Sequence, residues 1–435
     1  MDPNIVGILG IGTMLGLMVI GMPIGFAMFV SGVGGMFLLT STKAILSTIA
    51  TEPYGALAVY TQSTIPMFAL MGYFAFYGGL TKDIFQIARK WVGRLSGGLA
   101  MASVAGCAAF AFCSGSSLAS AAVMGQVAIP EMLRHGYDKR LAAGTVAASG
   151  TLAAMIPPSI ILILYGIITE QSIAKILLAG IIPGLVSAAI YMVGIFVIAR
   201  MNPLLAPIDS TKVMWRERFT SLKGTWGVLT LVVLVLGGIY TGTFSPTEAG
   251  AAGAVGALLL GLISRRINFR NFWAAVMDTA KITAQIFIII AGALMFSRML
   301  TFSRLPYVFA DWLLHFQVSP MVILIGVMGM YILLGTFMEP LGMMFITLPI
   351  IFPAIKALGF SPIWFGILLT KTMEIGVITP PVGMNVYALK SAAPKEVSLE
   401  DIFKGIFYFL GMDIVTLGLL IAVPSIATFL PDLMK

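Results

Sequence analysis

Two stretches of the sequence place a pair of prolines inside a long apolar segment. Residues 149–159 read SGTLAAMIPPS, and residues 374–385 read EIGVITPPVGMN. The surrounding segments, 141–168 and 364–391, are otherwise long enough to cross a membrane. Because proline has no backbone N–H, a carbonyl one turn earlier loses its partner in the helix. The two stretches therefore predict two crossing helices that are broken inside the bilayer and leave backbone oxygens free.

The composition places the rest of the chain in a lipid bilayer as well. Of the 435 residues, 59% are hydrophobic and only 10% are charged, whereas a soluble domain has about 25% charged residues. The mean hydropathy of +1.01 agrees with this interpretation. The net charge of +8 is interpreted as membrane topology, because the basic residues lie in short loops between apolar spans. A nucleic-acid partner is not expected.

We predict ten crossings and two re-entrant hairpins. The hairpins cover residues 97–133 and 319–356, which are interrupted at 114–117 and 339–340, so that each half is short for a full crossing. The crossings have lengths suited to a bilayer core of about 30 Å. In chain order they cover about 5–21, 23–40, 57–80, 141–168, 174–200, 226–242, 246–264, 279–300, 364–391 and 403–430.

The two halves of the chain resemble copies of one unit. A shift of 223 residues pairs four prolines of the first half with four of the second: Pro23 with Pro246, Pro130 with Pro353, Pro157 with Pro380 and Pro158 with Pro381. Five crossings per copy is an odd number, so the second copy is expected to be inverted, as in many transporters. The predicted fold is an all-α polytopic membrane protein, with the first inverted repeat at 1–200, a cytoplasmic linker at 201–225 and the second repeat at 226–435.

The basic residues predict the orientation in the membrane. If the N-terminus lies outside, 18 of the 26 Lys and Arg residues fall in the inside loops, which satisfies the positive-inside rule. Both ends of the chain are therefore predicted outside. The first hairpin would open from the cytoplasm and the second from the outside.

The turn of the first hairpin, CSGSSLAS at 113–120, is a candidate binding site. Irregular backbone at membrane depth is tolerated where it is buried in protein or lines a wet cavity. Its free carbonyls and Ser hydroxyls suit a small cation such as Na⁺, and the N-terminus of the helix that follows favours an anion. The alternative is that these small residues only let helices approach closely.

The second hairpin and the second break add ionisable groups. The turn reads GTFMEPLG at 335–342, and Glu339 is costly there unless it is paired, protonated or next to water. Lys371 and Glu374 lie three residues apart, so a local ion pair is predicted, with roles in cation coupling or substrate contact left open. Asn385, one turn past the break, is a donor for a carboxylate or hydroxyl.

Three other features have simpler interpretations. Residues 81–95 alternate basic and apolar side chains around Trp91, which predicts an amphipathic helix on the inner membrane surface. Gln285, in the eighth crossing, is interpreted as an interhelical hydrogen bond. Cys107 and Cys113 are interpreted as small core residues rather than a disulfide.

Several long motifs, in one order along the whole chain, resemble the large membrane subunit (the M or DctM-like subunit) of tripartite ATP-independent periplasmic (TRAP) transporters. They are MPIGFA at 22–27, GSSLAS at 115–120, IPEM at 129–132, IPPS at 156–159, GTFME at 335–339 and IGVITPPVGMN at 375–385.

The resemblance implies Na⁺-coupled uptake of an organic acid, such as a C4-dicarboxylate or a sialic acid, across a bacterial or archaeal inner membrane with both termini periplasmic. It also implies an elevator mechanism, a periplasmic substrate-binding protein and a small four-helix membrane subunit. This chain lacks the extra helices of fused members, so the small subunit is expected to be a separate chain. No cofactor besides the coupling ion is implied, and the protein is not expected to be an enzyme.

The resemblance also places two sodium sites, each between a hairpin turn and the neighbouring helix break. The residues implied as sodium ligands are Ser114, Ser117, Gly150, Ala153 and Ile156 for the first site, and Gly335, Glu339, Glu374 and Thr379 for the second. The predicted substrate contacts are Ser116, Ser117, Thr336 and Asn385. Family members often carry Asp where this chain has Glu339, so the role of that carboxylate stays open.

Two alternatives of other kinds remain at this point. One is a stand-alone carrier of similar inverted-repeat design, either a citrate or dicarboxylate symporter or a Na⁺/H⁺ antiporter. The other is a channel, which the paired half-helices ending at mid-membrane disfavour, because a channel needs a continuous pore. A membrane-embedded enzyme is disfavoured because the sequence offers no nucleophile–base pair and no metal-binding cluster.

Overall fold

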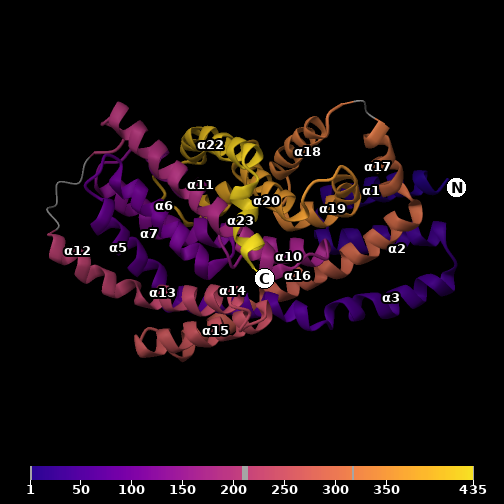
Figure 1. The fold of residues 1–435 in the computed structure, drawn as a ribbon, viewed down its shortest axis with the longest axis horizontal. Helices are drawn as coiled ribbons and strands as arrows, with labels where there is room; N and C mark the ends of the chain where they lie inside the picture. Colours follow the sequence, from indigo (N-terminus) through magenta and orange to yellow (C-terminus); the bar gives the residue numbers. More distant parts are fainter. Residues whose placement is uncertain (1, 208–213, 316–317, 435) are drawn as a thin grey trace.

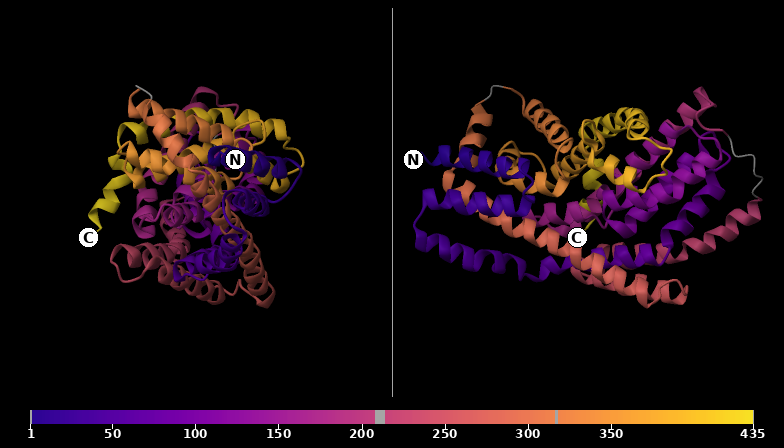
Figure 2. Two further views of the ribbon diagram at one scale, coloured as in Figure 1. Left: turned by 90° about the vertical axis from the view of Figure 1, so that its right-hand side faces the viewer. Right: turned by 180° about the vertical axis from the view of Figure 1, so that it is seen from behind.

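The computed structural model describes residues 2–207, 214–315 and 318–434. Within these ranges every regular element is helical. Figure 1 shows that helices from the two halves of the chain interleave, since the early indigo helices α1, α2 and α3 lie beside the orange helix α16. The two further views in Figure 2 show the same interleaving from the side and from behind. The predicted all-helical fold class is therefore confirmed.

The first half of the chain forms eleven α-helices and one short 3₁₀ turn in the described residues. They are α1 (Pro3–Val19), α2 (Ile24–Leu39), α3 (Thr42–Leu57), η1 (Tyr60–Ser63), α4 (Thr64–Tyr77), α5 (Leu80–Val92), α6 (Gly98–Ser114), α7 (Ser117–Arg134), α8 (Lys139–Gly150), α9 (Leu152–Met155), α10 (Ile160–Ile168) and α11 (Ile173–Met201).

The second half begins with short helices that follow one another closely. They are α12 (Trp215–Ser221), η2 (Leu222–Thr225), α13 (Trp226–Val232), the π-helical turn η3 (Val233–Gly237) and α14 (Gly238–Tyr240). The longer helices follow: α15 (Pro246–Ile263), α16 (Phe269–Ser303), α17 (Leu305–His315), α18 (Pro320–Gly335), α19 (Pro340–Ala357), α20 (Pro362–Ile378), α21 (Met384–Ala392), α22 (Leu399–Ala422) and α23 (Ser425–Leu433).

Helices α2 and α16 pack along much of their length and form the spine of one layer, with α4 and α15 packed together beside it. The close approach depends on glycine: a Cβ added at Gly292 would lie 2.0 Å from the carbonyl oxygen of Gly25. A stripe of small residues lets helix backbones approach in this way in membranes. We call the layer formed by α1–α4 and α13–α16 the outer layer, since it flanks the interrupted helices.

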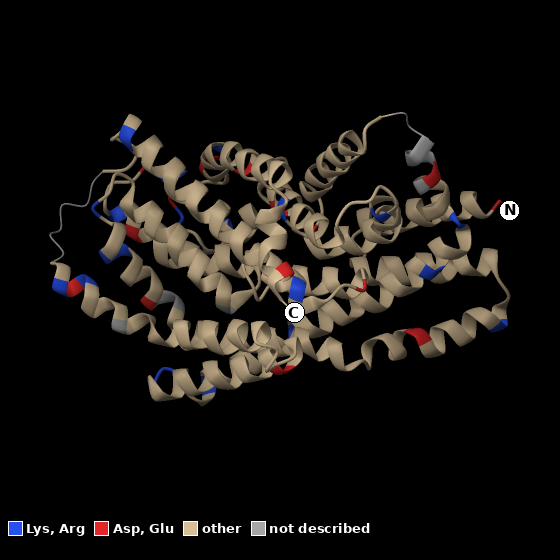
Figure 3. Cartoon of the chain, in the orientation of Figure 1, with Lys and Arg blue, Asp and Glu red and all other residues tan. Residues whose placement is uncertain are grey.

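The interrupted helices form a second group, which we call the core layer: α6–α11 and α18–α22. Helix α8 packs along α22, and α7 packs against α8 and α21, so each half of the chain contributes to the same core. Charged residues are sparse along these ribbons in Figure 3 and gather mainly near helix ends and loops. This distribution is the one expected of helices surrounded by lipid and by each other.

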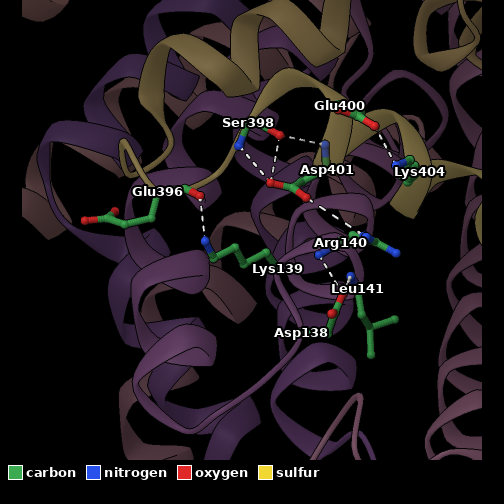
Figure 4. A network of polar contacts seen from close by, with 9 residues as sticks. All are labelled: Asp138, Lys139, Arg140, Leu141, Glu396, Ser398, Glu400, Asp401 and Lys404. Atoms are coloured by element: carbon green, nitrogen blue, oxygen red, sulfur yellow. Dashed lines mark hydrogen bonds and ion pairs between the residues drawn. The ribbon is translucent and has the colours of Figure 1, made fainter.

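A polar network joins α8 to the beginning of α22 (Figure 4). The Lys139 ammonium group donates to the carbonyl oxygen of Glu396 at 3.0 Å, and Arg140 lies 3.9 Å from the carboxylate of Asp401. Asp401 in turn accepts hydrogen bonds from Ser398, which caps α22. The network therefore ties the start of the first broken crossing to the last long helix.

The predicted helix breaks and hairpin turns are present. Helix α9 ends at Met155 and α10 begins at Ile160, with a bend of 40° between the two segments. Helix α20 ends at Ile378 and α21 begins at Met384. The two hairpin segments are interrupted as well, between α6 and α7 and between α18 and α19.

Some predicted spans are wrong in their bounds. The span predicted at 403–430 is two helices, because α22 ends at Ala422 and α23 begins after Pro424, a residue that disfavours helix before it. Helix α16 has 35 residues and begins well before 279, since Asn268 caps it by accepting from the Asn271 N–H at 2.8 Å. Helices α3 and α17 were not predicted, and α12 lies within the predicted linker.

The number of crossings stays a prediction. Among the described residues, five helices are long and apolar enough to cross a membrane, and the count rises to seven if each of two bent pairs is one span. Four apolar helices, including α1 and α2, are shorter. The inverted relation of the two repeats likewise stays a prediction.

Candidate functional site

Both hairpin turns face one cavity of about 710 Å³ between the core layer and the outer layer. The first turn contributes Ser116 and Ser117, and the second contributes Glu339 and Pro340. The start of α10, Tyr73 of α4 and parts of α2 and α16 also line it. The cavity is therefore bounded by both interrupted regions on one side and by continuous helices on the other.

The first hairpin turn is held against the first helix break through the backbone. Gly115 has a φ of +60°, and a Cβ there would lie 2.4 Å from the carbonyl oxygen of Pro158. The Ile160 N–H donates to the Gly115 carbonyl oxygen at 3.3 Å. Only glycine adopts this conformation without strain, and only glycine leaves the space. The sequence Ser-Gly-Ser thus allows the turn to dock on the break.

Ser159, directly after the two prolines, bonds backbone groups on both sides of the first helix break. The Ser159 hydroxyl accepts from the Leu162 N–H at 3.2 Å and so caps α10. The same hydroxyl donates to the carbonyl oxygen of Ala154, one of the carbonyls left free where α9 ends. The peptide bond between Pro157 and Pro158 is cis. Part of the backbone that the prolines release is therefore bonded locally, while the Pro158 carbonyl oxygen lies against the first hairpin turn at Gly115.

The second hairpin turn is held against the second break in the same manner. A Cβ on Gly335 would lie 2.8 Å from the Cα of Gly376, so the two helices touch at their backbones. The Gly383 N–H donates to the carbonyl oxygen of Thr336 at 3.2 Å. Gly383 also has a φ of +63°. Each turn therefore contacts its own break, which is the pairing that the family resemblance implies for two cation sites.

The residues predicted for the first sodium site lie close to one another and are mostly buried. Gly150, Ala153 and Ile156 are buried on α8 and α9 and at the end of α9. A Cβ on Gly150 would lie 3.0–3.1 Å from atoms of Ala121 in α7, so the break and the first hairpin touch here. Ser114 is half-buried, and its hydroxyl lies 3.2 Å from that of Ser120. Their role as ligands stays a prediction.

Some residues predicted for the second sodium site and for the substrate line the cavity, whereas others lie beside the second helix break. Ser116, Ser117 and Glu339 line the cavity. Thr336 is buried next to the second break, and its hydroxyl donates to the Leu333 carbonyl oxygen at 2.7 Å. The Thr379 hydroxyl is bonded in the same way, since it donates to the Ile375 carbonyl oxygen at 2.6 Å.

Asn385 lies apart from the cavity wall. It is fully buried, and neither its amide oxygen nor its amide nitrogen has a hydrogen-bond partner. An unpaired amide in this position costs free energy unless a ligand completes it. Its predicted contact with substrate therefore stays open, and the structure places it at the start of α21, directly after the second break.

The predicted ion pair between Lys371 and Glu374 is wrong. The Lys371 ammonium group bonds the carboxylate of Asp413 at 2.6 Å, and the Tyr191 hydroxyl donates to the same oxygen of Asp413. Glu374 instead accepts from the Ser117 hydroxyl at 3.3 Å. Lys371 and Glu374 therefore point to different neighbours, since Lys371 pairs with Asp413 on α22 and Glu374 contacts Ser117.

One residue near the site, Asp413, was missed in the sequence, and another, Gln285, was given a different role. Asp413 lies in an apolar span, and a lone carboxylate in such a span is itself a signal of function or pairing. Gln285 was interpreted as an interhelical hydrogen bond, whereas the structure places it exposed on the cavity wall. Cys107 is buried as predicted, and the side chain of Cys113 lies outside the described residues.

The donor set around the cavity suits a hard monovalent cation better than a transition metal. In the described parts of the chain no group of three or more His, Cys, Asp or Glu residues could hold a metal ion. Hydroxyls and main-chain carbonyls dominate instead at both turns and both breaks. A membrane protein in which interrupted helices meet at a cavity has the architecture of a secondary transporter.

Comparison with known proteins defines the family. Residues 11–426 match the family described as tripartite ATP-independent periplasmic transporter, DctM component. A C4-dicarboxylate TRAP transporter large permease protein of Vibrio cholerae is 35% identical, covering 97% of this chain and 96% of the relative. A sialic acid TRAP transporter large permease protein of the same species is 30% identical, covering 96% and 97% respectively. The chain belongs to the DctM family of TRAP transporter membrane components.

A solved structure supports the fold independently of the family. The YdaH transporter of Alcanivorax borkumensis aligns with a TM-score of 0.67 over 98% of each chain, at 15% sequence identity. At this identity the likeness concerns the fold alone. It shows that the arrangement of interrupted and continuous helices occurs in a transporter of very different sequence.

Proposed function

We propose that the chain is the large membrane subunit of a Na⁺-coupled importer for an organic acid in a bacterial or archaeal inner membrane. A periplasmic substrate-binding protein delivers the acid, and a small four-helix membrane subunit completes the complex. Support comes from relatives named for C4-dicarboxylate and sialic acid, both of which carry carboxylates. The observation that carries the proposal is that both hairpin turns dock on their own helix breaks and face one cavity.

In this proposal, Na⁺ binds where each turn meets its break. The first site uses the hydroxyls of Ser114 and Ser117 and backbone oxygens between Gly150 and Ile156. The second uses backbone oxygens around Gly335 and Thr379. Small alkali cations favour oxygen ligands, and the bond between Ile160 and Gly115 shows how closely backbone from the two elements approaches at the first site. Ions at these positions would order both turns.

The carboxylate of the substrate binds in the cavity between the two ordered turns. Helix α7 begins at Ser117, and its cap Ser116 lines the cavity, so the N-terminal end of the helix faces the substrate. Backbone N–H groups and the helix dipole favour an anion at this end. Because Na⁺ favours the same ordered state of the turns that the carboxylate requires, binding of the two is coupled.

The division into two layers supports the proposed alternate exposure of the cavity. The cavity lies between the core layer, which carries both turns, and α2 and α16 of the outer layer. In an elevator mechanism the core layer slides along the outer layer and carries ion and substrate together. The continuous helices α2 and α16 would serve as the fixed surface.

Reconstituted transport tests the proposal. The large subunit, the small subunit and the binding protein loaded with a radiolabelled acid are combined in proteoliposomes. We expect an inward Na⁺ gradient to drive accumulation, and we expect omission of the binding protein to abolish it. Uptake that is indifferent to the Na⁺ gradient would contradict the coupling, and uptake without the binding protein would favour a stand-alone symporter.

A further inference from the structure

A second cavity, of about 800 Å³, is lined by none of the residues proposed to bind Na⁺ or substrate. Its wall is formed by η1, the C-terminal part of α16, the end of α10 and part of α19. Helix α16 lines both cavities, since Ile286 and Ile289 face the first cavity and Ile290 and Ala293 face the second. The two cavities therefore follow one another along α16, and both lie between this helix and the core layer.

The wall of the second cavity combines an apolar part with a polar part. Ile290 and Leu294 of α16 and Phe345 and Leu348 of α19 belong to the apolar part. The polar wall residues all lie near helix ends that the predicted topology places outside: Thr61, Gln62, Thr169, Glu170, Ser297, Arg298 and Thr301. Along α16 the distance from Ile290 to Arg298 is about 12 Å. A cavity that is apolar at membrane depth and polar near the membrane surface suits an amphiphile better than a small polar acid.

Arg298 gives the polar part its positive charge, and it is the one basic residue among the described wall residues. Its Nη2 atom donates to the carboxylate of Glu52 on α3 at 2.5 Å, and its side chain is still 49% exposed. A guanidinium group has several further N–H donors, and their planar arrangement suits a phosphate or a carboxylate. Arg298 can therefore bind an anionic group while it keeps its ion pair with Glu52.

Two acceptor groups in the same wall lack a donor. Gln62 is 5% exposed, and its amide oxygen has no hydrogen-bond partner. Glu170 is exposed, and within the described ranges its carboxylate has no hydrogen bond or ion pair. A buried amide oxygen costs free energy until a donor completes it. The wall therefore favours a ligand that carries a positively charged N–H donor as well as an anionic group.

We propose that the second cavity binds one molecule of phosphatidylethanolamine. The lipid phosphate bonds the Arg298 guanidinium, the primary ammonium group donates to Gln62 and pairs with Glu170, and an acyl chain covers the apolar part of the wall. An ionised dicarboxylate does not fit equally well, because it offers only acceptors and no apolar chain. This inference goes beyond the proposed function and depends on neither Na⁺ nor the transported acid.

Native mass spectrometry of the purified complex of large and small subunits tests the site. The delipidated complex is titrated with palmitoyl-oleoyl phosphatidylethanolamine, and the fraction that carries lipid gives the affinity. Lipid also binds the membrane-facing surface of any such complex, so the difference between wild type and variant defines binding in the cavity. Arg298→Gln should weaken binding about three- to tenfold, as expected for lost hydrogen bonds to a charged group. Equal affinities of wild type and Arg298→Gln would overturn the proposal.

Arg304→Gln is the matched control. Arg304 directly follows α16, is exposed and does not line the cavity. The substitution removes the same charge near the same end of the helix and should leave the lipid affinity unchanged. If Arg304→Gln weakens binding as much as Arg298→Gln does, the general surface charge attracts the lipid and the proposed site is wrong.

Glu52→Gln separates lipid binding from a structural role of the ion pair. This variant removes the partner of Arg298 but keeps the guanidinium, so lipid affinity should be unchanged or higher. A purely structural ion pair would make Glu52→Gln and Arg298→Gln equally harmful. That result would contradict the proposal.

Gln62→Met tests the contact with the ammonium group and decides the matter if Arg298→Gln does not fold. Wild-type protein should prefer phosphatidylethanolamine to phosphatidylcholine, whose quaternary ammonium group has no N–H, and to phosphatidylglycerol, which has no ammonium group. In Gln62→Met the ratio of the first two affinities should fall to about one. The thermal unfolding temperature without lipid should not drop, because the amide oxygen has no partner to lose. A preference that survives in Gln62→Met, or is missing in the wild type, would refute the proposed contact.

Other occupants of the cavity give different results. Displacement of phosphatidylethanolamine by excess succinate or N-acetylneuraminic acid would assign the cavity to the transported acid. Binding to the large subunit alone, but not to the complex, would assign it to the small subunit. Either result would overturn the proposal, whereas uptake that ignores Na⁺ would contradict only the proposed function.

Discussion

At the scale of single residues, Gly115 joins two functional elements because it has no side chain. Its positive φ and its contact with the Pro158 carbonyl oxygen leave no space for a Cβ. The residues predicted a break at Pro157 and a turn around Ser114–Ser117, and only the family resemblance implied that the two meet. That contact depends on the path of the chain between them, which residue identity alone does not encode.

We predict that Gly115→Ala impairs transport and stability together. A residue with a Cβ at positive φ costs about 1 kcal/mol or more, before the clash with Pro158 is added. Uptake in proteoliposomes should fall at least severalfold, and the thermal unfolding temperature should drop. Gly418→Ala on α22 is the matched control, since a Cβ there meets nothing within 4 Å. If both substitutions have the same effect, the close contact at Gly115 is not important.

The buried pair of Lys371 and Asp413 leads to a second prediction at this scale. Lys371→Met or Asp413→Leu alone leaves one buried charge without its partner, which costs about 3–5 kcal/mol. The double variant removes both charges and should recover most of the stability lost in either single variant. Chemical denaturation of the purified protein measures this directly. Additive losses in the double variant would show that the two side chains do not act as a pair.

The sequence alone also did not indicate a role for Asp413. The carboxylate was visible in an apolar span, but its partner Lys371 lies far away in the sequence and was assigned to nearby Glu374. A spacing of three residues on a helix permits a contact without requiring it. In the folded chain Lys371 pairs with Asp413 instead, because α20 and α22 pack against each other.

At the scale of elements, helix existence was easier to predict than helix length. The prolines at 157–158 and 380–381 predicted both breaks, because the loss of a backbone donor is a local effect. The start of α16 depends on the cap formed by Asn268, and α3 contains Ser, Thr, Lys and Glu residues that hide its helical pattern. These elements are defined by caps and packing rather than by hydropathy.

We predict that linking α7 to α16 stops transport. Ser116 and Gln285 line the same cavity but belong to the core layer and the outer layer respectively. In a chain whose two native cysteines are replaced by alanine, Ser116→Cys together with Gln285→Cys should be joined by a bifunctional thiol reagent. If the core layer slides, the link should abolish uptake, and a cleavable linker should restore it on reduction.

Two controls accompany the cross-linking experiment. Each single cysteine variant treated with the reagent gives the activity that remains without a link, because Ser116 and Gln285 both line the cavity. A second pair confined to the core layer, Ser116→Cys with Leu341→Cys, also lines the cavity and tests whether any link is inhibitory. Full uptake by the linked pair of α7 and α16 would contradict movement between the layers.

At the scale of the whole molecule, the orientation in the membrane rests on the distribution of charge. Lys and Arg residues concentrate in loops that share one side if the chain begins outside. The structure places the network of Lys139, Arg140 and Asp401 at one end of the core layer. The direction of that end relative to the cell follows from the positive-inside rule.

We predict opposite accessibility for two exposed lysines. Lys43→Cys, at the start of α3, should react with a membrane-impermeant thiol reagent added to intact cells. Lys395→Cys, in the loop before α22, should react only after the membrane is made permeable. Both substitutions are made in a chain without native cysteines and are detected by a mass shift on gels. The reverse pattern would invert the proposed topology.

The hydrogen bonds that hold each turn against its break join peptide groups. The Ile160 N–H donates to the Gly115 carbonyl oxygen in one half, and the Gly383 N–H donates to the Thr336 carbonyl oxygen in the other. Peptide groups are present whatever side chains a descendant sequence carries. Side chains around the cavity can therefore change and bind a different acid while these backbone hydrogen bonds are kept. Redesign of cargo preference should start from Gln285 on α16 and Tyr73 on α4, which both line the cavity, and leave the glycines untouched.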